Sequence, residues 1–324
     1  MGKQDVMNIL ELVNEIMQYS DWSTVVRVGN VNRTLKYWAQ DIMQHRIRFH
    51  LGKFIKNDAT DRFWELLESL RGCIVGGLPR CIMSDPWATK LHRDHPPLEM
   101  DIVVPLCLED IHSTGLKLRR FLVATLDYQE KYFEEPNHPH KETTAGRFRL
   151  SSPVRIWQTR EDEKTLTTRQ TKCRTINIIL SSSPTSTLPV ILSLPNTASM
   201  CALTGGRLYN FYPNTTGRRI NIASEVEPSG QGCVYNYMVG LRTHRSTGIW
   251  VIPCGEVCPG RRRMSNNAKG VGVVQWGGPG NTSADAVLFD DLGPGTWMWR
   301  TGGVCRNVHC PEYGRRAVLG GLWR

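Results

Sequence analysis

Apolar residues recur at helical spacing through the first 55 residues of the chain. Positions 7, 10, 13, 16 and 17 are all apolar and would form one face of a helix. The segment SDWST at 20–24 supplies N-cap residues for a second helix, and apolar positions from Val31 towards Phe54 predict a longer amphipathic helix. The pattern therefore predicts two short helices and a longer one, a bundle too small to bury all of its apolar surface.

A polar segment, KNDATD at 56–61, separates these helices from a region with a different pattern. Thr60 is a candidate N-cap for a helix that Gly72 would end. Beyond it, short apolar runs alternate with helical stretches, which is typical of a mixed domain of helices and strands. The predicted strands are Cys73–Val75, Met100–Val104, Phe148–Trp157, Arg174–Leu180 and Leu208–Tyr212. The predicted helices are Leu116–Tyr128 and Leu188–Leu203, and the polar segment Phe133–Arg147 is expected to be an exposed loop.

From about Ser229 the chain is rich in Gly, Cys, Pro and Trp and has little helical period. This composition predicts short strands and tight turns, held by aromatic side chains or by something bound to cysteine. We therefore expect an α+β fold in three parts. They are a helical module at 1–56, a mixed sheet with helices at 57–228, and a Cys/Gly/Trp-rich region at 229–324 packed on that sheet.

Composition and charge narrow the function classes. The 324 residues are 40% hydrophobic and 22% charged, as in globular proteins, and no apolar run approaches the roughly 20 residues needed to cross a bilayer. The N-terminus lacks the features of a secretory signal, so we expect a cytoplasmic or nuclear protein without a membrane partner. The net charge of +10 is spread along the chain apart from Arg261–Arg263, which favours a solvated basic surface over a nucleic-acid site.

One stretch carries residues suited to phosphoryl transfer. Gly76 and Gly77 follow the first predicted strand, and Glu99 and Asp101 stand one residue apart on the next. Glycines let a backbone approach phosphate closely, and two acids at this spacing on a strand point to one face, where they can bind magnesium.

This arrangement resembles the nucleotidyltransferase fold of the polymerase-beta type. The resemblance implies a third acid on a neighbouring strand, which would complete a two-metal site. Here that strand is RTINIIL, where Asn177 and Ile179 stand in the middle, and a neutral amide cannot serve as a general base. Glu99 also replaces the usual first Asp, and 21 residues separate it from Gly77, more than in active members. The resemblance therefore implies the fold more strongly than the activity.

The N-terminal helices are similar to an F-box. Glu15, Ile16 and Met17 match its Glu-Ile-Leu segment, and Val31-Asn32-Arg33 with Trp38 matches its last segment, but the usual Leu-Pro opening is absent. The resemblance implies that these helices bind the linker subunit of a cullin-RING ubiquitin ligase. The residues expected at that interface are Val13, Ile16, Met17, Val25 and Val26. A cap on the following domain is the structural alternative.

The order of these parts resembles a group of F-box-type proteins of mushroom-forming fungi with a degenerate nucleotidyltransferase-like domain. It implies a non-catalytic adaptor that also binds an unknown protein substrate. The alternatives are a metal-dependent nucleotidyltransferase, with Gly76, Gly77, Glu99 and Asp101 at its nucleotide and magnesium site, and a zinc-stabilised nucleic-acid-binding module.

Cysteines of the last region have spacings that can bind zinc. Cys254 and Cys258 form one pair and Cys305 and Cys310 a second, with His309 and Cys233 as alternative ligands. Zinc suits a segment with little regular structure, because coordination can replace a hydrophobic core. The spacings are looser than those of a zinc ribbon, and Trp250, Trp276, Trp297 and Trp299 can supply a core without metal.

Overall fold

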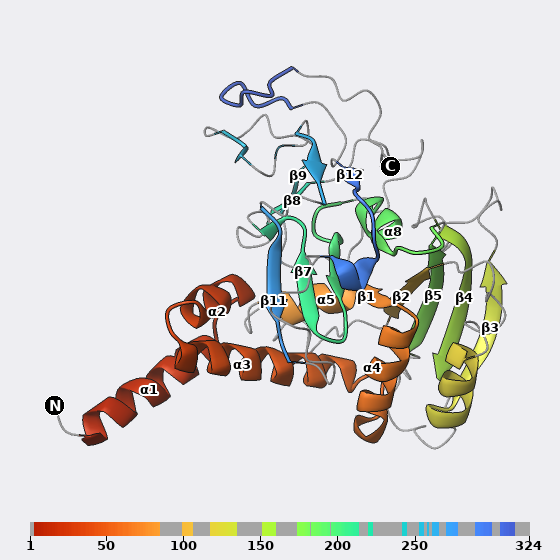
Figure 1. The fold of residues 1–324 in the computed structure, drawn as a ribbon, viewed down its shortest axis with the longest axis horizontal. Coiled ribbons are helices and arrows are strands. Elements are labelled where there is room, and N and C mark those ends of the chain that lie inside the picture. The colour runs from red at the N-terminus through yellow and green to blue at the C-terminus, as the bar shows by residue number, and fades with distance from the viewer. Residues whose placement is uncertain are drawn as a thin grey trace.

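The structure is a computed structural model in which a mixed sheet stands beside a group of N-terminal helices (Figure 1). The residues it describes are 3–84, 99–105, 117–134, 151–159, 174–181, 183–194, 196–213, 220–222, 242–244, 253–255, 258, 261–265, 270–277, 289–299 and 305–314. Within these ranges, no helix combines the length and the apolar character that a bilayer crossing requires.

Residues 3–51 form three helices, as predicted. They are α1 (Lys3–Gln18), α2 (Trp22–Gly29) and α3 (Arg33–Leu51), and α1 extends away from the sheet towards the N-terminus (Figure 1). The side chain of Asp21 caps α2 by accepting from the backbone N–H of Thr24 at 2.8 Å, and Asn32 caps α3 in the same way. The predicted N-cap segment at 20–24 is therefore confirmed.

A mixed sheet of eight strands forms the centre of the molecule, in the order β11-β7-β6-β1-β2-β5-β4-β3. Strands β2 and β5 are parallel, and the other neighbours in this sheet are antiparallel. The strands are β1 (Cys73–Val75), β2 (Glu99–Pro105), β3 (Tyr128–Glu134), β4 (Ser151–Thr159), β5 (Thr175–Ser181), β6 (Cys201–Leu203), β7 (Arg207–Asn210) and β11 (Gly272–Gln275). Two small ladders pair β8 (Ile220–Ile222) with β9 (Arg242–His244) and β10 (Arg263–Met264) with β12 (Met298–Trp299).

Each face of the sheet carries its own hydrophobic core. Side chains alternate along β1, so that Ile74 lies in one core while Cys73 and Val75 lie in the other. The first core joins the sheet to the N-terminal helices, to α4 (Thr60–Ser69) and to α5 (Gly77–Met83). The second joins it to α8 (Leu188–Leu192) and to residues 289–299. The N-terminal helices and the C-terminal region thus both share cores with the central sheet.

The predicted strands all correspond to observed ones, but two predicted helices are too long. The stretch Leu116–Tyr128 is α-helical at 117–120 and continues as a π-helical turn at Phe121–Thr125, but its last residue begins β3. The stretch Leu188–Leu203 contains α8 only at its start and ends in β6, which pairs with both β1 and β7. Most of the predicted loop Phe133–Arg147 lies outside the described residues, and its first two residues belong to β3.

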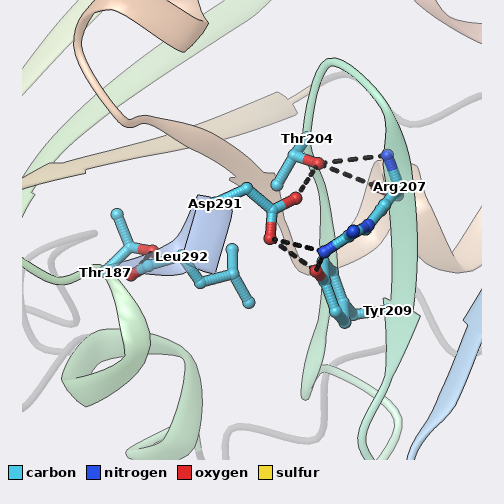
Figure 2. A network of polar contacts seen from close by, with 6 residues as sticks. All are labelled: Thr187, Thr204, Arg207, Tyr209, Asp291 and Leu292. Carbon is cyan, nitrogen blue, oxygen red and sulfur yellow. Dashed lines mark hydrogen bonds and ion pairs between the residues drawn. The ribbon is translucent and has the colours of Figure 1, made fainter. Parts of the chain in front are cut away.

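A buried polar network holds the C-terminal region on the sheet (Figure 2). Asp291, in the short helix Asp290–Leu292, accepts hydrogen bonds from the Thr204 hydroxyl at 2.6 Å and from the Tyr209 hydroxyl at 2.5 Å. The Arg207 guanidinium lies 3.8 Å from the same carboxylate and donates to the Tyr209 hydroxyl. On the other side of the short helix, the carbonyl of Leu292 accepts from the backbone N–H of Thr187.

Candidate functional sites

The Gly76–Gly77 pair connects β1 to α5 directly beside Asp101. Val75 is paired with Asp101 across the sheet, and Gly76 has a φ of +73° that favours glycine. A Cβ on Gly76 would lie only 3.3 Å from Asp101 Oδ2, whereas a Cβ on Gly77 would meet no atom within 4 Å. The structure therefore brings Gly76 next to Asp101, as the sequence predicted, and Gly77 follows at the start of α5.

Strand β5 places Asn177 next to Asp101. The two residues are partners in the parallel β2–β5 ladder, and Asn177 Nδ2 donates to Asp101 Oδ1 at 2.7 Å. The Asn177 side chain is 1% exposed, and among the described residues its Oδ1 atom has no hydrogen-bond partner. Glu99 lies two residues before Asp101, on the same half-buried side of β2. An amide therefore stands where the resemblance implies a third carboxylate.

Arg80 is a further charged residue at this site that the sequence analysis missed. It lies in the first turn after Gly76 and Gly77, and only 7% of it is exposed. Burial lowers the pKa of its guanidinium, which lies near Cys81 and Cys201. The Cys201 thiol in turn contacts the carbonyl of Gly76 at 3.3 Å. The helix that carries it, α5, was not predicted, so the sequence offered no signal beyond its position close after the two glycines.

The residues expected to bind a ligase subunit divide into two groups. Met17 and Val25 are fully buried in the first core, so neither side chain is available to a partner. Val13 and Val26 are partly buried against the same core. Ile16 is 54% exposed and belongs to a different stripe, which runs along α1 and just past its end. Its members are Ile9, Leu12, Ile16 and Tyr19, each 46–66% exposed.

Four cysteines from two distant segments converge into one buried cluster, as the zinc hypothesis requires. The Sγ atoms of Cys254, Cys258, Cys305 and Cys310 all lie within 4.8 Å of one another, and each residue is at most 6% exposed. Cys254 Sγ lies 3.7 Å from Cys305 Sγ, and Cys310 Sγ lies 3.6 Å from Cys258 Sγ. Four thiolates at 2.3 Å from a zinc ion would be about 3.8 Å apart in a tetrahedron, so the cluster can hold a metal ion.

The surroundings of the cluster favour thiolates. Burial alone would raise the pKa of the Cys310 thiol, but hydrogen bonds from the backbone near Glu312 and Cys254 and from neighbouring thiols lower it. The buried Asn307 amide lies 3.3 Å from Cys254 Sγ, where it can donate to the sulfur. Tight turns shape both segments, since Cys258 N–H donates to Gly255 O and Cys310 N–H donates to Asn307 O.

The alternative ligands and the triple arginine do not extend this site. His309 is exposed and is not part of the cluster, and Cys233 lies outside the described residues. Arg263 is only 6% exposed, with its guanidinium 4.7 Å from the centre of the Tyr212 ring and bonded to the carbonyls of Phe211 and Gly270. The expectation of a solvated Arg261–Arg263 turn is therefore wrong at Arg263. The described indoles of Trp276, Trp297 and Trp299 are buried.

Comparison with family models, with curated proteins and with solved structures found no match to this chain. The class that the fold and the sites define is an α+β protein with an acidic strand site beside a glycine turn and a buried four-cysteine cluster.

Proposed function

We propose that the protein is a non-catalytic adaptor built on a nucleotidyltransferase-like sheet. The observation that carries the proposal is the hydrogen bond between Asn177 and Asp101. It supports a site that keeps the glycine turn and one acidic strand, while a neutral amide replaces the group that would activate an attacking hydroxyl. The order of elements also supports the proposal. Along the chain it is α4, β1, the glycine turn, α5 and β2, with β5 beside β2 in the sheet, as expected for a nucleotidyltransferase-like domain.

The adaptor reading assigns the exposed stripe of α1 to a partner helix. Ile9, Leu12 and Ile16 repeat at spacings of three and four, so they line one face of α1, and Tyr19 continues that face. A helix that lays its apolar face on another is a common recognition mode. The proposed partner remains the linker subunit of a cullin-RING ubiquitin ligase, now bound through this stripe instead of through Met17 and Val25.

A pull-down of that linker subunit tests the adaptor proposal. The full chain is the appropriate bait, because Ile47 and Leu51 of α3 belong to the core that supports the sheet. We expect the full chain to bind, the variant Leu12→Asp/Ile16→Asp to lose binding, and the variant Val123→Asp to retain it. Val123 is 44% exposed and lies outside the N-terminal helices, so it is a matched control. Equal retention of the subunit by all three proteins would contradict the proposal.

A nucleotidyltransferase remains the alternative reading, because Gly76 and Asp101 are placed as that chemistry requires. Incubation with magnesium, radiolabelled nucleoside triphosphates and RNA or protein acceptors separates the two readings. The adaptor proposal expects no transfer by the wild-type chain. Transfer that disappears in Asp101→Asn would establish the enzyme, with a third carboxylate supplied from elsewhere.

We further propose that the four cysteines bind one structural zinc ion. The separations of 3.6 and 3.7 Å between thiols support it, because they are close to the edges of a zinc–thiolate tetrahedron. All four positions of such an ion would be occupied by protein sulfur, which suits a structural role more than a catalytic one. The ion would link residues 254–258 to residues 305–310, where the protein has few regular elements.

Metal analysis of the purified chain tests the zinc proposal. We expect about one zinc per chain, lost in Cys258→Ser/Cys310→Ser and retained in the matched variant Cys73→Ser, whose thiol lies in the second core. Because a ligand that binds only the folded state stabilises it, added zinc should also raise the Tm of the metal-stripped protein. Metal-free protein that neither takes up zinc nor changes its Tm would refute the assignment.

A further inference from the structure

Strand β11 ends the sheet beside the helical hairpin α2–α3, and a cleft lies between them. In the described part of the chain, β11 pairs with β7 on one side and with no strand on the other (Figure 1). The cleft has a volume of about 290 Å³. It is lined by Val26, Gly29, Asn30, Lys36, Ala39 and Gln40 from the helices and by Arg207 and Val273–Gln275 from the sheet.

The register of β11 shows which of its backbone groups face this cleft. Trp276 N–H donates to the carbonyl of Gly206, so these two residues form a hydrogen-bonded pair at the end of the ladder. Such pairs alternate along an antiparallel ladder, which makes Val274–Leu208 and Gly272–Asn210 the next ones. The N–H and C=O groups of Val273 and Gln275 therefore point away from β7. Among the described residues, nothing bonds to these outward groups.

We propose that this cleft binds an extended peptide segment of a partner protein as a ninth strand beside β11. Unpaired donors and acceptors along a strand edge are matched best by another extended backbone. Val273 and Gln275 lie two residues apart, so a peptide strand that spans three residues would engage both. The cleft is at the lower end of the range of pockets that enclose small ligands, roughly 300–1,000 Å³, and that also favours a narrow strand.

The charge of the cleft predicts one feature of the peptide. Lys36 is an exposed cation on its wall, whereas the Arg207 guanidinium is already occupied by Tyr209 and Asp291. An acidic residue of the peptide would therefore lie near Lys36, and aliphatic residues would pack on Val26 and Ala39. The ligand class is an extended, acidic, β-branched peptide. This inference rests on the proposed adaptor function, for which it supplies the surface that binds the target.

Selection of phage-displayed random heptapeptides on the full chain tests the inference. We expect enriched peptides that combine an acidic residue with Val, Ile or Thr. Val273→Pro should weaken the binding of the synthetic peptides about tenfold, because it removes one donor and places a ring where the added strand would lie. Proline is tolerated at such an outward position of an edge strand, so the Tm should change little.

Two further measurements keep the result decisive if Val273→Pro does not fold. Lys36→Glu should exclude the acidic peptides, and Lys117→Glu, a change at another exposed lysine, should not. Only every second N–H of an added strand faces β11. N-methylation of the odd-numbered peptide residues and of the even-numbered ones should therefore differ, with one set abolishing binding and the other leaving it intact. Absence of enrichment, or binding that none of these changes alters, would overturn the proposal.

A dimer of the chain at micromolar concentration, disrupted by Val273→Pro, would also overturn it by assigning the edge to a second copy. The peptide selection uses no ligase component. Failure of the linker pull-down with successful peptide selection would therefore reject the ligase role alone. The reverse result would reject the peptide cleft alone.

Discussion

Gly76 and Gly77 are adjacent in the sequence but differ in backbone conformation and in the space around them. Gly76 has a φ of +73°, and a Cβ there would press on Asp101, whereas Gly77 begins α5 with open space around it. We expect Gly76→Ala to lower the free energy of unfolding by about 1–3 kcal/mol, because this conformation is costly for residues with a side chain. Gly77→Ala should have little effect. Urea denaturation of both variants measures the difference, and equal losses would contradict this account.

The N-cap residue Asp21 should make part of the stability depend on pH. Burial opposes ionisation of its carboxyl, but hydrogen bonds from Thr24 and Ser23 outweigh this and lower its pKa. A lowered pKa in the folded state stabilises the protein above the unfolded pKa of about 3.9, and the effect is lost as the pH falls through the folded value.

We therefore expect Asp21→Ala to cost about 1 kcal/mol at pH 7 and less in acid. Asp21→Asn keeps a capping oxygen without the charge, so its free energy relative to Asp21→Ala should not change between pH 7 and about pH 2. Denaturation curves across that range measure both. A cost of Asp21→Ala that is constant down to the acid limit would show that the charge contributes nothing.

At the scale of single residues, the sequence identified the candidate magnesium and zinc ligands but did not show which apolar and basic side chains are buried. The proximity of Gly76 to Asp101 followed from the nucleotidyltransferase resemblance, and the spacing of the four cysteines raised the zinc hypothesis that their convergence supports. Met17 and Val25 were assigned to a partner because an amphipathic pattern does not tell which apolar side chains contact the chain's own core. Arg263 was assigned to solvent, yet the rings of Tyr212 and Trp299 cover it, and these come from segments that no local pattern connects.

Among the elements, the short helix Asp290–Leu292 is hydrogen-bonded to the β6–β7 hairpin through the carboxylate of Asp291. Asp291 accepts from two hydroxyls and faces Arg207, and its side chain is 20% exposed (Figure 2). We expect Asp291→Asn to lower the free energy of unfolding by about 1–3 kcal/mol, because the buried donors lose a charged acceptor. Asp290→Asn, at an exposed neighbour, is the matched control. Similar denaturation midpoints for the two variants would refute this role.

Some elements were not predicted because they are too short to show a pattern of their own. Residues 188–203 have the apolar content of one long helix, but only Leu188–Leu192 is helical. Cys201–Leu203 became a strand because it fills the position between β1 and β7 in the sheet. A strand of three residues has almost no period of its own, so its conformation is decided by neighbours that are distant in the sequence. Strand β1 is equally short and was found only because its apolar run ends at two glycines.

For the whole molecule, the sequence predicted the α+β class but not the order of the strands. Strand β11 pairs with β7 although more than 60 residues separate them, and no hydrophobic pattern encodes such a partner. The order matters for both proposals, since it places Asn177 against Asp101 and leaves β11 at an edge of the sheet. It also gives the C-terminal region the second face of the sheet, where side chains of residues 289–299 share a core with β1 and β7.

The cysteines that the structure describes fall into two classes, those buried in β1, α5 and β6 and those of the four-cysteine cluster, which should respond differently to metal removal. Burial raises the pKa of Cys73 and Cys201 to about 12 and that of Cys81 to about 11, so these thiols stay protonated near neutral pH. The pKa of Cys310 is shifted the opposite way, and a thiolate is the reactive form. With zinc bound, we expect iodoacetamide to modify neither class quickly at pH 7.5.

Chelation of the metal should then expose Cys310 and its three cluster partners to the reagent, while the thiols of Cys73, Cys81 and Cys201 remain unmodified until the protein unfolds. Mass spectrometry of digested samples after a short pulse of iodoacetamide identifies the labelled cysteines. If chelation labelled both classes together, the metal would support the whole fold, and the cluster would not be a local clamp. If it labelled neither, the four thiols would be held by packing alone, as the buried thiols of Cys73 in β1 and Cys201 in β6 are.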